Sequence, residues 1–197
     1  MALDADQLVI PGSGHVYVGD ANETFPATIG TAVTTSGASG FVELGYTTES
    51  GVSFSVGRVT KEIKSWQSGY PLRRLITDTP TTVSFSLLQF TYASFRLAMG
   101  GGAIGNAGGS NYFYEPPDPD FTDERSLIIE AADGDYNYRW LFRRVMLSDS
   151  VNFNLMRTEA ITFPLKFDVL ESGTPSQKPW AFQTDDPEIG QFALVGT

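Results

Sequence analysis

The stretch TTVSFSLLQF (residues 81–90) decides the fold class of this chain. Apolar and hydroxyl side chains alternate along it, so an extended backbone places Val83, Phe85 and Leu87 on one face. The opposite face then carries small hydroxyl groups. This pattern is typical of a β-strand that turns one face to a core and the other to water.

The period of the pattern changes directly after this strand. In TYASFRLAMGGG, which follows, Tyr92, Phe95 and Met99 recur at helical spacing. Thr91 can cap such a helix, and the glycines can end it. We therefore predict one short α-helix at about residues 91–99.

Further strands are predicted on the C-terminal side of this unit. Residues 126–149 contain two strand patterns around Asp133-Gly134, a common hairpin signal. In residues 158–172 apolar side chains recur at every second position, although Pro164 lacks a backbone N–H and so requires a free edge or a bulge nearby. The predicted fold class is mostly β: an antiparallel β-sandwich or barrel with one short α-helix.

Glycine, proline and small polar residues divide the chain into parts. We predict a single domain with extended arms at both ends, an N-terminal arm at residues 1–45 and a C-terminal arm at residues 173–197. Residues 46–80 are expected to form a projecting hairpin, and residues 81–172 the β core, in which the Gly- and Pro-rich stretch 100–124 is a loop. Two interpretations of the arms stay open, since they could dock on a neighbouring copy or wrap their own domain.

The composition limits the classes of function. The chain has 23 Asp and Glu residues against 13 Lys and Arg residues, a net charge of −10, so it will not bind a phosphate backbone over its whole surface. It has no cysteine, which excludes disulfides and thiolate metal sites. The opening residues lack the basic and apolar regions of a signal peptide, and no apolar run approaches membrane-spanning length. We therefore expect folding in a cytoplasm.

No catalytic, cofactor or metal site is predicted. The single histidine, His15, lies in the predicted N-terminal arm, which argues against a Ser–His–Asp site. The run at residues 100–105 spells G-x-G-x-x-G, but it follows a helix, whereas the dinucleotide fingerprint follows a strand and opens a helix. We expect a protein that is not an enzyme and that needs no cofactor.

Residues 40–102 resemble the major tail tube proteins of long-tailed, non-contractile bacteriophages, the siphoviruses. The likeness lies in LGYTTESGV (44–52), IKSWQS (63–68), the strand and helix described above, and the GGG that follows the helix. The segments RWLFRRVMLSD and EAITFPLKF also fit, so the likeness spans roughly residues 40–170. Gln89 departs from the pattern, in which an acidic residue is expected.

The resemblance implies a sandwich-like fold whose copies form homohexameric rings. These rings would stack into a tube, with the inner strands joined into one barrel around the lumen. It also implies assembly in the host cytoplasm around a tape measure protein, contacts with tail terminator and tail-tip proteins, and a place in the virion tail. Genomic DNA would pass through the lumen without specific binding. Residues 46–80 would dock on the next ring, and the two arms would link neighbours.

Two sets of residues are predicted to serve such a tube. Acidic side chains on the non-core faces of strands would repel phosphate and let DNA slide, or they would only solvate an outer face. The candidates for the lumen are Glu62, Glu130, Glu159 and Asp168. Aromatic and arginine side chains are enriched in interfaces. The candidates for contacts between subunits are Trp66, Tyr70, Arg73, Arg74, Arg139, Arg143, Trp180 and Phe182.

Three other classes stay open. A soluble β-sandwich binding module, for carbohydrate or as a surface adhesin, would need an aromatic platform, for which Tyr112, Phe113 and Tyr114 are the compact candidate. An enzyme such as a glycoside hydrolase would need an acid–base pair, and nothing in the sequence selects one. The tube of a contractile injection apparatus shares the implied fold, but the arms and the projecting hairpin favour a phage tail.

Overall fold

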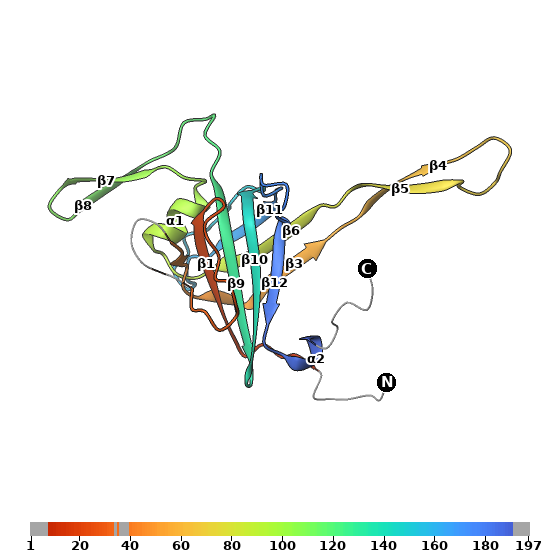
Figure 1. The fold of residues 1–197 in the computed structure, drawn as a ribbon. Coiled ribbons are helices and arrows are strands. Elements are labelled where there is room, and N and C mark those ends of the chain that lie inside the picture. Colours follow the sequence, from red (N-terminus) through yellow and green to blue (C-terminus); the bar gives the residue numbers. More distant parts are fainter. Residues whose placement is uncertain (1–7, 34, 36–39, 191–197) are drawn as a thin grey trace.

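The structure, a computed structural model, describes residues 8–33, 35 and 40–190 (Figure 1). It is mostly β with antiparallel sheets, which confirms the predicted fold class. The elements in chain order are β1 (Ser13–Asp20), β2 (Val42–Glu43), β3 (Thr47–Val56), β4 (Val59–Ile63), β5 (Arg73–Asp78), β6 (Thr81–Leu87), α1 (Tyr92–Ala98), β7 (Ala103–Gly108), β8 (Asn111–Glu115), β9 (Glu124–Asp133), β10 (Tyr136–Leu147), β11 (Phe163–Val169), β12 (Trp180–Thr184) and α2 (Pro187–Gly190).

Eight of these strands form one sheet, in the order β2-β1-β9-β10-β11-β6-β3, with β12 also paired to β10. β12 pairs with residues 138–142 of β10 and β11 with residues 145–147, so the two strands share one edge of the longest strand. The sheet curves until its two halves pack on one core, as in a sandwich (Figure 1). β10 pairs only with residues 167–169 of β11, so at Pro164 the strand β11 has a partner, β6, on one side only. The free edge that the missing N–H of proline requires is therefore present.

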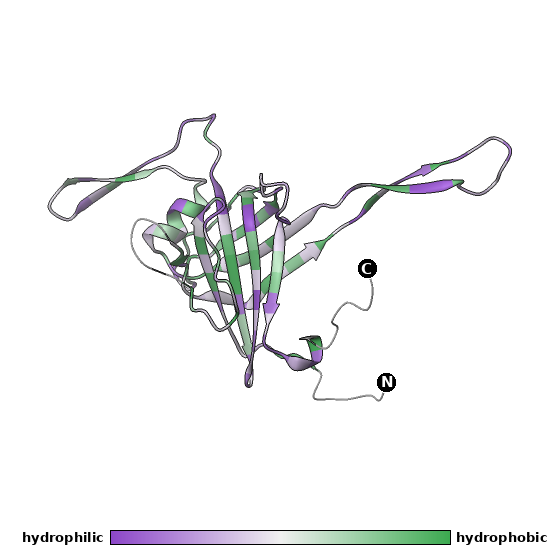
Figure 2. Cartoon of the chain, in the orientation of Figure 1, coloured by the Kyte–Doolittle hydropathy of each residue, from purple (hydrophilic) through white to green (hydrophobic). Residues whose placement is uncertain are grey.

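The main core lies between the two halves of the sheet. The alternating apolar residues of β6 and β11 are both buried in it, together with apolar residues of β1, β9 and β10. Figure 2 shows hydrophobic positions along the strands of the body. Each buried phenylalanine contributes about 1.5–3 kcal/mol of hydrophobic stabilisation. Core residues from the strands include Val16, Val83, Phe85, Leu87, Leu127, Phe142, Phe163, Leu165 and Phe167.

The helix α1 closes one end of this core and spans Tyr92–Ala98, inside the predicted range. Thr91 begins it with a capping box: its hydroxyl accepts the N–H of Ser94, and the Ser94 hydroxyl accepts the N–H of Thr91. Leu97 and Ala98 are buried in the core. A second helix, the single turn α2, was not predicted.

Replacing Thr91 with alanine is expected to destabilise the protein by about 1 kcal/mol, because the N–H of Ser94 loses its acceptor. Thr91→Ser keeps the hydroxyl and should remain close to the native stability. Urea unfolding followed by circular dichroism measures both. Equal stability of the two variants would contradict a role for the cap.

Both predicted arms contribute strands to the body. β1 pairs with β9 from Ser13↔Ala132 to Asp20↔Arg125, and its Val16 and Val18 lie in the core. β12 pairs with β10 in the same sheet. HVYVG (15–19) indicates a short strand locally, but the composition did not indicate that either segment joins the body. The partner strands lie more than 100 positions away for β1 and about 40 for β12. Residues 1–7, 34, 36–39 and 191–197 of the predicted arms lie outside the described residues. Within the described part of the chain, no helix has the length and apolarity to span a membrane.

Candidate functional site

Two hairpins project from opposite sides of the body, β4–β5 on one side and β7–β8 on the other (Figure 1). The first hairpin lies within the segment predicted to project, and every residue of β5 is exposed. Near its tip Trp66 is 99% exposed and Tyr70 82% exposed. Large apolar side chains held out in water on a paired ribbon are typical of a surface that a partner covers.

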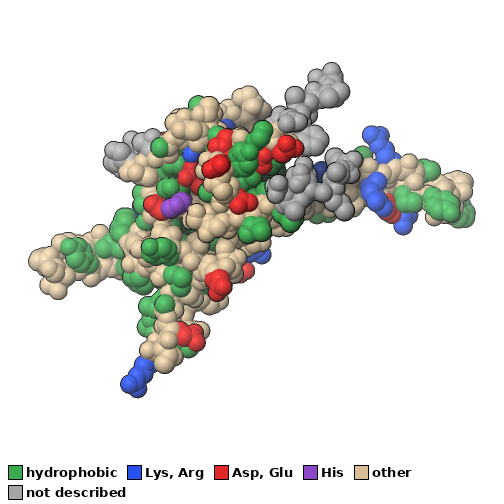
Figure 3. All heavy atoms as spheres, turned by 90° about the horizontal axis from the view of Figure 1, so that it is seen from below, with side chains coloured by type: hydrophobic (Ala, Val, Ile, Leu, Met, Phe, Trp, Pro, Cys, Tyr) green, Lys and Arg blue, Asp and Glu red, His purple; other side chains and the backbone are tan. Residues whose placement is uncertain are grey.

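The first hairpin is also the most basic part of the chain. Residues 57–80 hold five of the 13 Lys and Arg residues but two of the 23 Asp and Glu residues. Arg74 and Lys64 both pair with Glu62, and the hydrogen bond from Arg74 lowers the pKa of Glu62. Figure 3 shows cationic side chains gathered along this hairpin and hydrophobic ones at its tip. Its other cations form no ion pair with any residue that the structure describes: Arg58, Lys61 and Arg73.

The second hairpin occupies a stretch that we predicted to be a loop. Its turn is built by Asn106, whose side-chain oxygen accepts the N–H of Gly108 at 2.7 Å. Gly108 and Gly109 have φ values of 114° and 63°, a region that glycine enters without steric cost. The glycines therefore make the turn of a regular hairpin instead of preventing one. The two extended runs on either side of Gly108-Gly109 were the signal that could have found it.

The three aromatic residues of β8 do not form a platform. Successive side chains of a strand point to opposite faces, so Phe113 faces away from Tyr112 and Tyr114. Tyr114 is partly buried, with its ring 5.0 Å from that of Phe95 and its hydroxyl donating to the Gly101 carbonyl at 3.2 Å. Burial and the electrostatic effect of Asp123 raise the pKa of Tyr114 despite the opposing effect of Arg96. Only Tyr112 and Phe113 remain exposed, on different faces.

The outer face of β3, β6 and β11 is lined by small hydroxyl groups. Across the strands Ser53 lies opposite Ser84, and Ser84 lies opposite Lys166. The neighbouring row continues in the same way from Ser55 through Thr82 to Asp168. Since Lys166 and Asp168 have opposite signs, this polar face carries almost no net charge.

This half of the sheet also has open edges. β3 ends the strand order, so its outer edge pairs with no described strand. The N–H of Gly57 points towards β6, because it donates to the Pro80 carbonyl at 2.7 Å. Successive N–H groups of a strand point to opposite edges, so the N–H of Val56 points away from β6, to the free edge of β3. β11 is open at residues 163–165, beside the end of β10. Unpaired strand edges are ready to be extended by another strand.

The opposite half of the body is covered by the strap, which we define as residues 21–33. Phe25 and Val33 of the strap pack against Ile128 and Leu141 on the outer face of β9 and β10. This second cluster lies across the sheet from the main core. The N-terminal segment therefore wraps its own domain here, which answers one of the open alternatives for these residues.

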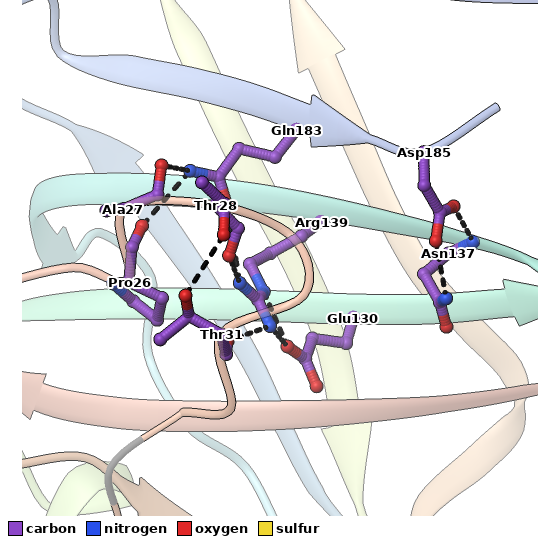
Figure 4. A network of polar contacts seen from close by, with 9 residues as sticks. All are labelled: Pro26, Ala27, Thr28, Thr31, Glu130, Asn137, Arg139, Gln183 and Asp185. Atoms are coloured by element: carbon purple, nitrogen blue, oxygen red, sulfur yellow. Dashed lines mark hydrogen bonds and ion pairs between the residues drawn. The ribbon is translucent and has the colours of Figure 1, made fainter. Parts of the chain in front are cut away.

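Arg139 fastens the strap to the sheet (Figure 4). Its guanidinium donates to the carbonyls of Thr28 at 2.9 Å and Thr31 at 3.0 Å, and to Glu130 at 2.5 Å. Arg139 is only 3% exposed. The side-chain amide of Gln183, on β12, donates to the strap carbonyls of residues 26 and 27. The hydrogen bonds of the Arg139 guanidinium described above are thus all made to groups of its own chain.

The predicted subunit contacts separate into two groups. Trp66, Tyr70, Arg73 and Arg74 lie exposed on the first hairpin. The others make contacts within the chain: Arg139 as described, Arg143 with its guanidinium carbon 5.2 Å from the ring centre of Phe25, Trp180 against Phe54 at 5.2 Å, and Phe182 against Trp140 at 5.1 Å. Packing of β12 on β10, which the sequence did not reveal, explains the last two.

The four predicted lumen acids do not share one surface. Glu62 pairs with cations on the first hairpin, and Glu130 pairs with Arg139 beneath the strap. Glu159 lies exposed in the irregular segment between β10 and β11. Asp168 stands on the polar face of β11. Neither Glu159 nor Asp168 forms an ion pair with a described residue.

Gln89, the departure from the expected pattern, has a defined role. Its side-chain oxygen accepts the N–H of Tyr46 at 3.0 Å. A Cβ on Gly45 would lie 1.5 Å from that oxygen, so the contact requires glycine next to Tyr46. A carboxylate oxygen could accept the same bond, so the amide preserves the link between the start of β3 and the end of β6.

Two aspartates fix the end of β12 to β10. Asp185 accepts the backbone and side-chain N–H groups of Asn137 at 2.6 and 2.9 Å, which lowers its pKa. Tyr138 donates its hydroxyl to Asp186 at 2.8 Å, and this hydrogen bond, with burial, raises the pKa of Tyr138 to about 12.

Stability should fall as the pH rises through the pKa of Tyr138. An unfolded tyrosine loses its proton near pH 10, whereas the folded one holds it to about pH 12, so the contribution is complete below pH 10 and is lost between these values. Tyr138→Phe is expected to flatten this alkaline slope in urea unfolding midpoints. Tyr46→Phe, at an exposed position, is the control. An unchanged slope in Tyr138→Phe would contradict the assignment.

Comparison with known proteins adds one finding. The family model described as phage tail tube protein matches residues 1–193 of the chain. The match covers the body, both hairpins and the strap. A search of curated proteins finds no match.

Proposed function

The chain belongs to the phage tail tube protein family, and from this premise we propose that its copies close into hexameric rings that stack into a hollow tube. A structural role in the virion tail follows from the family itself. The proposal adds that the tail is long and non-contractile and that the tube conducts the genome. The observation that carries ring closure is the open edge of β3.

Ring closure joins sheets of neighbouring copies. The free edge of β3 in one copy pairs with the open part of β11 in the next, so that β3, β6 and β11 of all copies form one continuous barrel. A closed barrel leaves no edge for aggregation. The main core holds these strands in place from behind, which leaves their polar face free to line the lumen.

The polar face suits a conduit for DNA. Hydroxyl groups do not hold phosphate as lysine or arginine does, and Lys166 is balanced by Asp168 within each copy. Before DNA enters, the same surface would surround a tape measure protein. Terminator and tip proteins would cover the open rings at the two ends of the tube.

Electron microscopy tests this function directly. Negatively stained particles of the purified chain, or tails from virions that contain it, should give six-fold end views and tubes of stacked rings. Rings of another order would overturn the hexamer. Solid filaments without a lumen would overturn the proposed conduit.

Replacing Asp168 with lysine is expected to slow DNA ejection on the order of tenfold, because each ring would add cations to the lumen wall. Asp168→Asn removes the acid without adding a cation and should slow ejection less. The measurement is receptor-triggered DNA release from virions carrying each variant, with tail length checked by microscopy. Native ejection rates in Asp168→Lys would place this face outside the lumen.

A further inference from the structure

A hollow of about 280 Å³ lies on the polar face formed by β3, β6 and β11. Lys166 and Asp149, two side chains of opposite charge, line it together with serines. Ser53, Ser84 and Lys166 stand in one row across the three strands, in which opposite Cβ atoms lie about 4.5–5.5 Å apart. A cation and several hydroxyl groups therefore face one space. The serines that line the hollow are Ser50, Ser53, Ser84, Ser86 and Ser150.

The hydrogen-bond donors of this hollow are not used within the chain. Lys166 is exposed and forms no ion pair with a described residue, in contrast to Arg139 and Arg144, which each bind a carboxylate. In the described part of the chain, the side-chain hydroxyls of three of the serines also have no hydrogen-bond partner: Ser53, Ser84 and Ser86. An exposed ammonium among free hydroxyls offers an oxyanion both a charge and hydrogen-bond donors.

The proposed tube brings one oxyanion to this face, the phosphodiester group of DNA. Duplex DNA carries about one negative charge per 1.7 Å of its axis, so a phosphate stands near every copy of Lys166 at each moment of its passage. In a closed ring all copies present this lysine at the same height, and stacked rings repeat it along the lumen. A contact to phosphate does not read the bases, so it is independent of the DNA sequence.

Two carboxylates keep such a contact weak. Asp149 lines the same hollow, and Asp168 lies on the same face two positions further along β11, about 7 Å of extended strand. This separation is similar to the Debye length of about 8 Å at physiological salt, so Asp168 lowers the attraction for phosphate only in part. The net charge of the face can therefore be close to zero while Lys166 still meets each phosphate at contact distance.

We propose that Lys166, with the hydroxyls of Ser53 and Ser84 beside it, is a phosphate-contact site that slows the passage of DNA through the tube. The inference rests on the proposed function and names the side chain that acts on the DNA. Each ammonium binds one phosphate and releases it as the duplex advances. The neighbouring carboxylates, above all Asp149, shorten the time for which each phosphate is bound.

Replacing Lys166 with glutamine tests this contact, because the variant loses the charge and keeps an exposed polar side chain. Receptor-triggered DNA release from virions carrying Lys166→Gln should be about threefold faster than native release, since every ring loses its cations. Lys166→Arg keeps the charge and is the matched control, which should not release DNA faster than the native tail. Asp149→Asn should slow release about twofold, because its amide oxygen still accepts the N–H of Ser150 but no longer repels phosphate.

Salt provides a readout that a merely structural role of Lys166 would not change. Raising the ionic strength from about 50 to about 200 mM screens the contact between ammonium and phosphate. The native release rate should therefore rise by a larger factor than the rate of Lys166→Gln, in virions with equal tail length. Equal factors would overturn the proposal.

The outcomes separate this inference from the proposed function. Native or slower release in Lys166→Gln, with slower release in Asp168→Lys, would overturn the phosphate contact and leave the polar face in the lumen. Native release in both variants would remove this face from the lumen altogether. Tails of altered length or number in Lys166→Gln, with native release from those that form, would show that the lysine binds the tape measure protein instead of DNA and would refute the proposal. The melting temperature of each purified chain should stay native, because Lys166 and Asp149 are exposed.

Discussion

Replacing Val56 with proline is expected to abolish ring closure while leaving the single chain folded. The N–H of Val56 points to the free edge of β3, so proline removes a donor that the isolated chain does not use. In a ring, that donor would pair with the neighbouring copy. Because the side chain is half exposed, the cost to the stability of the monomer should stay at about 1 kcal/mol.

Two further variants make this test specific. Val56→Thr keeps the N–H and should assemble as the native chain does. Ser55→Pro removes a donor that faces β6, so it should destabilise the monomer by about 3 kcal/mol instead. Mass photometry gives the assembly state, and urea unfolding gives the monomer stability. Native rings from Val56→Pro would show that β3 is not a ring contact.

The elements that the sequence predicted are those whose signals are local. The alternation of β6 and β11 and the cap at Thr91 can each be recognised within ten residues. A short strand at HVYVG (15–19), within β1, can be recognised in the same way, but its place in the core sheet cannot, because its partner β9 lies more than 100 positions away. β12 was missed altogether. The β7–β8 hairpin was missed because its glycines were taken as evidence against regular structure and not as the residues of a turn.

The same distinction applies to the candidate site. The pair Glu130–Arg139 was within reach of the sequence only as one of two registers. A two-residue turn at the predicted Asp133-Gly134 would set 130 opposite 137, whereas the observed turn at Gly134-Asp135 sets 133 opposite 136 and therefore 130 opposite 139. The strap carbonyls that complete this network were not, because a side-chain contact to a backbone oxygen 108 positions away leaves no pattern. Contacts between copies of the chain leave no partner within one copy, so a single chain shows only exposed, unpaired groups where such contacts form.

Replacing Arg139 with methionine is expected to destabilise the protein by about 2–3 kcal/mol. Removing one partner of a fully buried ion pair costs about 3–5 kcal/mol, because the remaining charge has no compensation. Here the side chain of Glu130 is 24% exposed, so water recovers part of that cost. The carbonyls of Thr28 and Thr31 lose their donors at the same time. For a chain of this length the melting temperature should fall by roughly 5–10 °C.

The Arg139→Met variant is also expected to show a local effect on the strap, in addition to the loss of overall stability. Without Arg139, the hydrogen bonds that still join residues 26–31 to the sheet are those from Gln183, and only Phe25 and Val33 on either side pack on the second cluster. Proteases should therefore cut the strap before the body unfolds. Arg144→Met breaks the pair with Glu124, in which the arginine is 32% exposed against 4% for Arg139, and is the matched control. We expect a cost below about 1 kcal/mol and no change in strap cleavage. Adding Glu130→Gln to Arg139→Met should recover part of the stability, because it removes the uncompensated charge. Native stability and native protease resistance of Arg139→Met would show that the apolar contacts of Phe25 and Val33 hold the strap by themselves.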